Sequence, residues 1–337
     1  MHYLSVLQPL APVLSAIMAA LLVDILLRLV AAGRDHLDPL LGLPAGLARW
    51  LQQKLDRPER SREDRQVRGR LAVGFVMIIG LICGAFLQYV SEIKSIFSII
   101  IWFFCFRLTF IWTASVDLLK IWSMKDAEFV TKGMNILRRR HVEPLVPNVK
   151  PDRHAVARML IESLAVSLHR GWLSPVFWAL VSALLNWSPL AIGVWTVFLL
   201  EAQRVIVTAE NKNSAFAQSF EVIESAINFI PARIAAMFFV LGAVFTPGAK
   251  PLTAFRAMFV QSDGHRFVNG GWPVAAVAGA LNVALPSGIK DTQWLGPKNA
   301  TAKAGFNDVK RALWLHCVTV AVMGLIFTSL LFLSLAS

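Results

Sequence analysis

The chain has 337 residues, of which 56% are hydrophobic, and its mean hydropathy is +0.59. This composition excludes an ordinary soluble domain, and the length is sufficient for several membrane spans. The net charge of +12 does not indicate a nucleic-acid-binding protein, because the basic residues gather between apolar runs, where membrane topology and anionic headgroups account for them. We predict an all-α, polytopic transmembrane helical bundle with cytoplasmic amphipathic helices, organised as a single domain over residues 1–337.

Apolar runs of about 20 residues predict membrane spans, because a helix of that length crosses the hydrocarbon core. The first run, Leu10–Ala32, has no basic segment before it and no cleavage site behind it, so we expect a retained span. Asp24 and Arg28 lie one turn apart in it, as a pair that either orients the helix or has a function. Spans are expected at about residues 10–32, 71–90, 96–118, 172–187, 190–207, 226–245 and 312–335, with a short helix at 272–286.

Two of these spans are expected to form a helical hairpin. Tryptophans flank residues 172–187, and Ser188-Pro189 separates that run from the next one as a tight turn would. The run at 226–245 contains Pro231 and Arg233, and the helix at 272–286 is short, so both are expected to be re-entrant or buried within the bundle.

Basic residues predict the side of the membrane on which each polar segment lies. Arg49–Arg70 and Lys120–Arg170 are rich in arginine, which places both in the cytoplasm and the amino terminus outside. The sequence from Leu43 to Asp56, which overlaps the first of these, resembles an amphipathic cytoplasmic helix of a known membrane-protein family. The side of Gly248–Arg311 stays open, because its basic residues favour the cytoplasm whereas the parity of the spans places its start outside.

Cysteines and most histidines do not indicate a metal site. Cys83, Cys105 and Cys317 lie within apolar runs, where they are expected to pack as small apolar residues. His141, His154 and His169 lack the spacing of a zinc helix, so we expect surface or headgroup residues rather than ligands. The sequence has no phosphate-binding loop, dinucleotide fingerprint or nucleophile elbow.

Charged and polar residues beside apolar helices are the candidate functional groups. An arginine one turn beyond Pro231 in a membrane helix needs an anion or a carboxylate, so Arg233 is expected either to pair with Glu224 or Asp24 or to bind phosphate. Asn228 is expected to hydrogen-bond the backbone that Pro231 leaves free.

A glycine-rich turn followed by small residues is the least ordinary segment of the chain. Residues 270–273 read Gly-Gly-Trp-Pro, and the helix after them carries small side chains. Such residues let backbones approach closely, so this helix is expected to pack against another helix or a ligand. The face concerned consists of Ala275, Ala278, Gly279 and Asn282.

Three segments resemble the adenosylcobinamide-phosphate synthase (CobD/CbiB) family of integral membrane proteins of cobalamin biosynthesis. Residues 162–178 keep the frame of the family's E-S-x-A-E-N-x-x-D-G-x-x-[SA]-P-L-F, residues 224–233 resemble D-D-x-x-N-W-I-P-A-R, and residues 269–285 resemble N-A-G-W-P…A-x-A-G-A-L-x-V. The chain departs from the first pattern where Val166, Ser167 and Arg170 replace the family's Glu, Asn and Asp. This departure removes two carboxylates, which matters because Mg²⁺ prefers oxygen ligands.

The resemblance implies ATP- and Mg²⁺-dependent amide formation between adenosylcobyric acid and aminopropanol or its phosphate. It implies a location in the bacterial inner membrane with the main polar loops in the cytoplasm. The implied partners are the lipid bilayer, the corrinoid and the aminopropanol-type substrate, and nucleic acid is not among them. The oligomeric state stays open. The catalytic residues carried over by position are Glu162, Glu224 and Arg233, which are expected to lie together around a polar pocket; Glu162 and Glu224 are also the candidate metal ligands. The candidate substrate-binding residues are Ser163, Lys212, Asn228, Asn269, Gly271, Trp272 and Pro273.

Two other readings stay open. Residues 213–233 also align without gaps to the pattern of AmpE-type membrane proteins, so the chain is alternatively a non-catalytic signalling or regulatory protein with a degenerate site and no cofactor. A small-molecule transporter would explain a broken helix and intramembrane charges, but paired interrupted helices are not seen in two halves of the sequence.

Overall fold

The computed structural model describes residues 7–30, 42–93, 95–108, 121–122, 124–139, 152–207, 214–261, 265, 269–286 and 294–336, and for residues 23–30, 42, 95, 103–108 and 138–139 only the backbone. The expected Asp24–Arg28 pair, Lys212 and His141 therefore lie outside the described side chains. The chain divides into two compact units. The first unit comprises Met1–Phe110, Gly171–Ile227 and Phe327–Ser337, and the second comprises Ile111–Arg170 and Asn228–Ile326.

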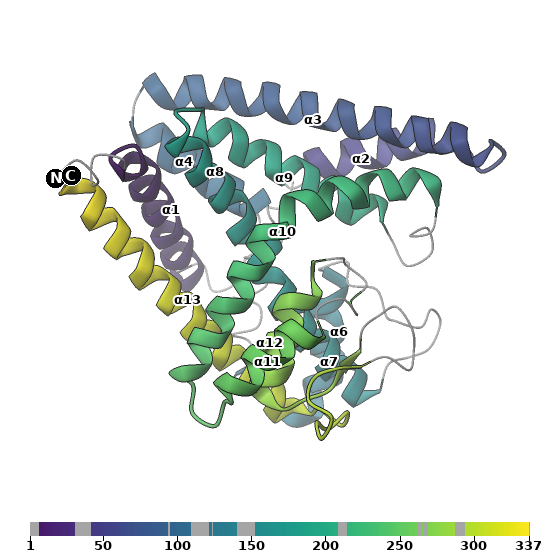
Figure 1. Cartoon of the computed structure of the whole chain (residues 1–337), viewed down its shortest axis with the longest axis vertical. Coiled ribbons are helices and arrows are strands. Elements are labelled where there is room, and N and C mark those ends of the chain that lie inside the picture. Colours follow the sequence, from purple (N-terminus) through teal and green to yellow (C-terminus); the bar gives the residue numbers. More distant parts are fainter. Residues whose placement is uncertain are drawn as a thin grey trace. The chain divides into compact units, whose positions relative to one another are not determined.

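The regular structure of the described residues is almost entirely helical, which confirms the predicted all-α class (Figure 1). Four of the described helices are long and apolar enough to cross a membrane: α3 (Arg62–Ile93), α9 (Pro189–Ile206), α10 (Ala215–Val244) and α13 (Phe306–Leu335). They correspond to the spans predicted at 71–90, 190–207, 226–245 and 312–335. The fold is therefore that of a helical membrane protein.

The first unit is a bundle of helices built around the contact between α3 and α9. Its other members are α1 (Leu10–Val30), α2 (Gly42–Leu55), α4 (Ser95–Leu108), α8 (Ser174–Leu184), the beginning of α10 and the end of α13. Helix α2 confirms the amphipathic helix expected from Leu43 to Asp56. Helices α8 and α9 pack on each other across residues 185–188, which confirms the predicted hairpin.

Glycines let α3 and α9 approach closely. A Cβ atom built on Gly84 would lie 2.5 Å from the carbonyl oxygen of Ala191, and one built on Gly80 would lie 3.1 Å from Cβ of Phe198. Gly80 and Gly84 are one turn apart on the same face of α3. This spacing of small residues is typical of membrane helices that pack backbone against backbone.

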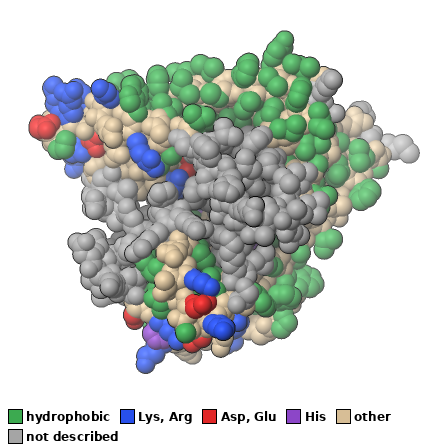
Figure 2. All heavy atoms as spheres, turned by 180° about the vertical axis from the view of Figure 1, so that it is seen from behind, with side chains coloured by type: hydrophobic (Ala, Val, Ile, Leu, Met, Phe, Trp, Pro, Cys, Tyr) green, Lys and Arg blue, Asp and Glu red, His purple; other side chains and the backbone are tan. Residues whose placement is uncertain are grey.

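The opposite face of α3 presents large apolar side chains to the surroundings, as expected of a lipid-facing helix. Leu71, Ile82, Phe86 and Tyr89 are between 60% and 68% exposed. Figure 2 shows hydrophobic side chains along this helix and charged ones gathered at its amino-terminal end. There Arg65 pairs with Asp56 at 2.8 Å. The basic segment Arg49–Arg70 is mostly helical, because it comprises the end of α2 and the beginning of α3.

The second unit combines shorter helices with parts of two candidate spans. It holds a 3₁₀ turn, η3 (Asp126–Glu128), and helices α6 (Phe129–Arg139), α7 (Arg153–Ser167), α11 (Pro251–Val260) and α12 (Gly271–Leu281), with the end of α10 and the beginning of α13. Two short strands, β1 (Leu285–Pro286) and β2 (Trp294–Leu295), pair antiparallel with Leu285 opposite Leu295. Helix α12 therefore ends before the expected residue 286, because Asn282 adopts a left-handed conformation with φ 58° and the chain turns toward these strands.

Helix α10 runs without interruption through Pro231. Proline has no N–H group, so the carbonyl of Ile227 loses its partner within the helix. The indole Nε1 of Trp178 in α8 donates a hydrogen bond of 3.0 Å to this carbonyl. The sequence analysis did not anticipate Trp178 as a donor to this carbonyl, and the role expected of Asn228 stays a prediction.

Candidate functional site

Helix α7 carries the first candidate residues into the interior of the second unit. The helix begins after Asp152, whose side chain accepts a hydrogen bond of 2.6 Å from the backbone N–H of Ala155. At its other end, α7 continues into a π-helical turn, η4 (Leu168–Leu173). Single π turns within α-helices are frequent at functional sites.

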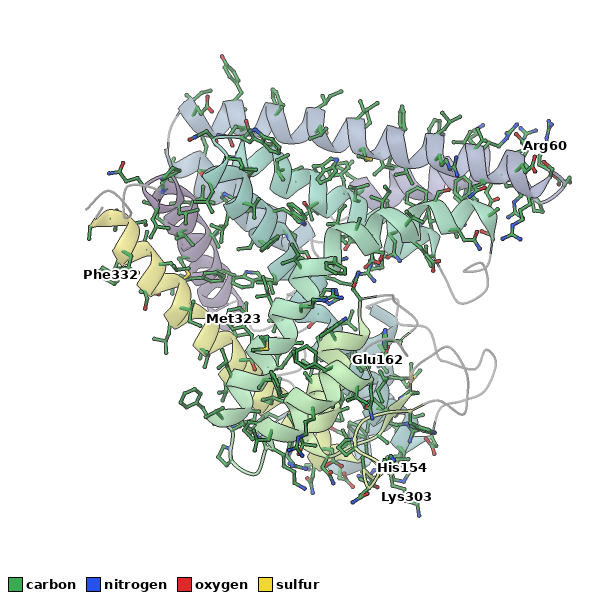
Figure 3. All side chains as sticks on the ribbon, viewed as in Figure 1. Arg60, His154, Glu162, Lys303, Met323 and Phe332 are labelled. Atoms are coloured by element: carbon green, nitrogen blue, oxygen red, sulfur yellow. The ribbon has the colours of Figure 1, made fainter. Side chains whose placement is uncertain are left out.

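The central pair of the site joins α7 to the segment before α12. Oε1 of Glu162 lies 3.1 Å from Nε2 of His265, and the two side chains are 2% and 0% exposed. A carboxylate only accepts hydrogen bonds, so Nε2 of His265 carries the proton in this pair. Figure 3 labels Glu162 among the side chains of α7.

Two further polar residues of the π turn are buried near this pair. His169 is 0% exposed and Arg170 is 4% exposed. Burial lowers the pKa of His169 well below its usual value of 6.5, and the nearby charges of Arg170 and His265 lower it further, while the carbonyl of Val166 opposes the shift without reaching hydrogen-bond geometry. Neither ring nitrogen of His169 has a hydrogen-bond partner among the residues that the structure describes.

The expectation that His169 is a surface residue was wrong. His154 is partly buried and its Nδ1 hydrogen-bonds the carbonyl oxygen of Ala304 at 2.8 Å, in the region where Figure 3 labels His154 and Lys303. The sequence analysis also missed His265, although it stands four residues before Asn269 in the segment leading to the glycine-rich turn. Its position close to this motif was the one signal in the sequence that could have identified His265 as a site residue.

Arg233 lies among aromatic rings of the second unit. Its guanidinium carbon is 3.6 Å from the centre of the Phe229 ring and 4.3 Å from the centre of the Trp272 ring. The ring of Phe259 meets that of Trp272 edge-on at 5.5 Å. Cation–π contacts of this kind stabilise a guanidinium in a partly buried position. The aromatic contacts of Arg233 were not anticipated from the sequence.

The glycine-rich turn forms the start of α12. The backbone N–H of Trp272 points back to the carbonyl of Asn269 at 3.4 Å, and Asn269 itself is only 3% exposed. Further along, a Cβ atom built on Gly279 would lie 2.7 Å from the carbonyl oxygen of Thr253 in α11. The expectation that the small-residue face packs closely against another helix is therefore confirmed, with α11 as the neighbour.

The structure distributes the expected site residues over the two units. Glu224 is buried, with 2% exposure, in the first unit. The second unit holds the rest of those described: Glu162, Ser163, Asn228, Arg233, Asn269, Gly271, Trp272 and Pro273. Asn228 is fully buried at 0% exposure and Ser163 is partly exposed.

The described residues around Glu162 do not form a site for a resident magnesium ion. Mg²⁺ requires several hard oxygen ligands in octahedral geometry. Glu162 instead faces an imidazole, with His169 and the cationic Arg170 nearby. Across the described parts of the chain, no group of three or more His, Cys, Asp and Glu side chains is arranged to hold a metal ion.

The helices and this buried charged cluster define a membrane protein with a polar site enclosed in one helical unit. A sequence model of the CobD/Cbib protein family matches residues 17–316. The chain belongs to this family. No solved structure matches the chain.

Individual relatives support the same assignment. The chain is similar to the "Cobalamin biosynthesis protein CobD" of Rhodobacter capsulatus, with 35% identity over 137 residues, which is 40% of this chain and 39% of the relative. It is similar to proteins of the same name from Brucella melitensis, with 32% identity over 51% of this chain and 53% of the relative, and from Rhizobium meliloti, with 30% identity over 53% and 54%. The chain thus matches between 39% and 54% of the length of these relatives.

Proposed function

We propose that this protein acts in cobalamin biosynthesis, where it joins the carboxyl group of adenosylcobyric acid to the amine of aminopropanol or its phosphate. Membership of the CobD/CbiB family and the names of the relatives support the pathway. The proposal includes ATP as a co-substrate that activates the carboxyl group. Because the described residues around Glu162 do not form a site for a resident Mg²⁺, the ion enters in this proposal with ATP, as part of that substrate.

The observation that carries the proposal is the buried pair of Glu162 and His265. Forming an amide requires the attacking amine nitrogen to lose a proton, and a histidine oriented by a carboxylate is suited to accept it. In this mechanism Glu162 accepts the hydrogen bond from Nε2 of His265 at 3.1 Å and fixes the ring. The amine proton passes to Nδ1 of His265 as the new C–N bond forms and the bond from the acyl carbon to the phosphate or AMP supplied by ATP breaks, and Glu162 stabilises the imidazolium.

Arginine side chains of the same unit supply positive charge for the anionic reactants. Arg170 is buried beside His169, and Arg233 is held between the rings of Phe229 and Trp272. A guanidinium forms bidentate hydrogen bonds with a carboxylate or phosphate and keeps its charge when desolvated. Arg170 stands where the family pattern has an acidic residue, so a basic group replaces a carboxylate at this position.

The proposed location is the bacterial inner membrane, with the basic segments at Arg49–Arg70 and Lys120–Arg170 in the cytoplasm, where ATP is available. Single cysteines introduced at Arg60 and Arg139 test this orientation. Neither position is expected to react with a membrane-impermeant maleimide added to intact cells from the periplasmic side. Labelling of either position before the membrane is permeabilised would contradict the topology.

Complementation and product detection test the activity. The wild-type gene is expected to restore cobalamin-dependent growth to a strain that lacks its own synthase. Purified protein with adenosylcobyric acid, aminopropanol phosphate and MgATP should yield an amide detectable by mass spectrometry. His265→Ala is expected to reduce the rate at least about 100-fold, as removal of a general base does, and Glu162→Gln less so. A fully active His265→Ala protein would exclude this mechanism.

The AmpE-like reading remains the second candidate because of one specific observation. Val166, Ser167 and Arg170 occupy positions where the family pattern has Glu, Asn and Asp. In that case the protein is a non-catalytic membrane component for signalling or regulation and needs no ATP. Failure of the wild-type chain to complement or to form product, with the protein folded in the membrane, would favour this reading, as would the absence of cobalamin genes nearby.

A further inference from the structure

A pocket of about 230 Å³ opens in the second unit, away from the residues discussed above. It lies where α10 ends, where α12 ends and where α13 begins. The residues that line it are Trp122, Thr246, Pro247, Leu281, Lys310, Arg311 and Trp314. No role is assigned to any of them by the proposed reaction.

The pocket lies at the ends of two candidate membrane spans. The apolar run of the candidate span α10 ends at Val244 and Phe245, and that of α13 begins at Ala312, directly after Arg311. The two spans contact each other near these ends, where a Cβ atom on Gly242 would meet the side chain of Thr319. Gly242 lies less than one turn before the end of the apolar run of α10, and Thr319 lies about two turns into that of α13. Both ends therefore lie on the same side of this contact, within about two turns of it, where we expect hydrocarbon to give way to headgroups.

Tryptophans line the pocket at this level. The rings of Trp122 and Trp314 lie 6.0 Å apart, centre to centre, and the residues are 47% and 46% exposed. Tryptophan is enriched at the interface between hydrocarbon and headgroups because its ring is apolar and its N–H is polar. Phe245, which is 67% exposed, continues this apolar surface toward the bilayer.

The charge of the pocket is positive. Among the described residues, its lining includes two cations and no acidic side chain. Nζ of Lys310 lies 4.4 Å above the ring of Phe306, and Arg311 contacts Asp308 and the carbonyl of Gly248, both at 3.3 Å. The side chain of Arg311 is 42% exposed, so its pairing with Asp308 is weak and leaves the guanidinium able to bind another anion.

We propose that this pocket binds the phosphate headgroup of an anionic phospholipid. The chemistry is that of a phosphodiester anion held by Lys310 and Arg311, with the glycerol region against the two tryptophans. Basic pockets at the membrane interface bind anionic headgroups in this manner. A free phosphate would satisfy the two cations but would leave the tryptophans and Phe245 exposed, which favours a lipid.

Lipid binding to the purified full-length protein tests the proposal. Native mass spectrometry in detergent, with phosphatidylglycerol and phosphatidylcholine added in separate titrations, gives the affinity for each. Phosphatidylglycerol is expected to bind about tenfold more tightly, since each cation near a headgroup contributes to attraction. Lys310→Gln/Arg311→Gln should remove this preference, and Lys310→Gln alone, which loses a contact with the Phe306 ring and an electrostatic interaction with Asp126, should weaken it.

A matched control separates a defined site from general attraction between charges. Lys298→Gln/Lys303→Gln removes two exposed cations of the same unit that do not line the pocket, and it should leave the preference intact. An unchanged preference in both Lys310 variants, or an equal loss in the control, would overturn the proposal. Displacement of phosphatidylglycerol by inorganic phosphate at similar concentration would overturn the lipid assignment in favour of a free-phosphate site.

Discussion

Trp178 in α8 donates its indole N–H to the carbonyl of Ile227, which is the carbonyl that Pro231 leaves without a partner inside α10. The hydrogen bond is 3.0 Å long, and Ile227 is only 6% exposed. A proline inside a candidate membrane span therefore does not leave an unsatisfied carbonyl in an apolar environment. The same bond attaches α10 to the hairpin of α8 and α9.

We predict that Trp178→Phe lowers the free energy of unfolding by about 1–3 kcal/mol, because the carbonyl of Ile227 loses its donor. In a Pro231→Ala background the loss should fall to less than half, since residue 231 then supplies its own N–H. Unfolding of purified protein in mixed micelles measures both values. Equal losses in the two backgrounds would show that Trp178 stabilises the protein by packing alone.

The contact between Arg233 and Trp272 predicts a measurable coupling. Arg233→Gln and Trp272→Leu should be non-additive by about 0.5–2 kcal/mol in a double-mutant cycle on stability, because each change removes the same cation–π contact. Arg233→Lys keeps the charge but not the planar group that stacks on the rings, so it should recover only part of the stability. Strict additivity of the two changes would exclude an energetic role for this contact.

Arg233 also has a predicted role in activity. If the protein is a synthase, Arg233→Ala should abolish complementation, because a desolvated anion would lose its cationic partner. Membrane abundance of the variant, measured by quantitative blotting, separates loss of activity from loss of protein. Normal growth with Arg233→Ala would remove this residue from the proposed site.

The close approach of α11 and α12 predicts that Gly279 cannot be replaced. In Gly279→Leu the new Cβ would lie 2.7 Å from the carbonyl oxygen of Thr253 and 2.8 Å from Cα of Ala254, so backbone must move. We expect a lower folded yield and a loss of at least about 1–3 kcal/mol. Gly74→Leu in α3 is the control, because a Cβ there meets nothing within 4 Å. Similar yields of the two variants by size-exclusion chromatography would contradict this packing.

His169 predicts a dependence of stability on pH. Its pKa in the folded protein is lowered well below 6.5, so between these two values the unfolded chain binds a proton that the folded protein does not. The free energy of unfolding should therefore fall as the pH drops through 6.5, with a contribution from this residue approaching about 1.4 kcal/mol per pH unit. His169→Gln lacks this contribution and should show a shallower decline between pH 7 and pH 5.5. Parallel pH profiles for the two proteins would show that folding does not lower the pKa of His169.

Local patterns in the sequence predicted the helices and their class. Apolar runs located α3, α9, α10 and α13, because this signal repeats within a few residues of the same helix. The small residues around Gly279 predicted a close helix contact for the same reason. Resemblance to a segment of a known family located α2. These features follow from residues that are close together in the sequence.

The candidate site was predictable only in part, because it depends on contacts between segments far apart in the chain. Nothing near Glu162 in the sequence indicates His265, which is 103 residues away. The burial of His169 depends on the π turn, and the partner of Ile227 comes from another helix. Pattern matching to a family located Glu162 and Arg233. It did not predict that Glu162 contacts the imidazole of His265 or that Arg233 contacts aromatic rings.

The number of residues in the π turn at Leu168–Leu173 affects the direction in which Glu162 points. Each hydrogen bond of a π turn encloses one residue more than an α-helical bond does. Deleting a single residue there would give one continuous α-helix and would rotate Glu162 by about 100° around the helix axis relative to α8. Evolution can therefore change where this carboxylate points by gaining or losing one residue, with every side chain of the helices on either side retained.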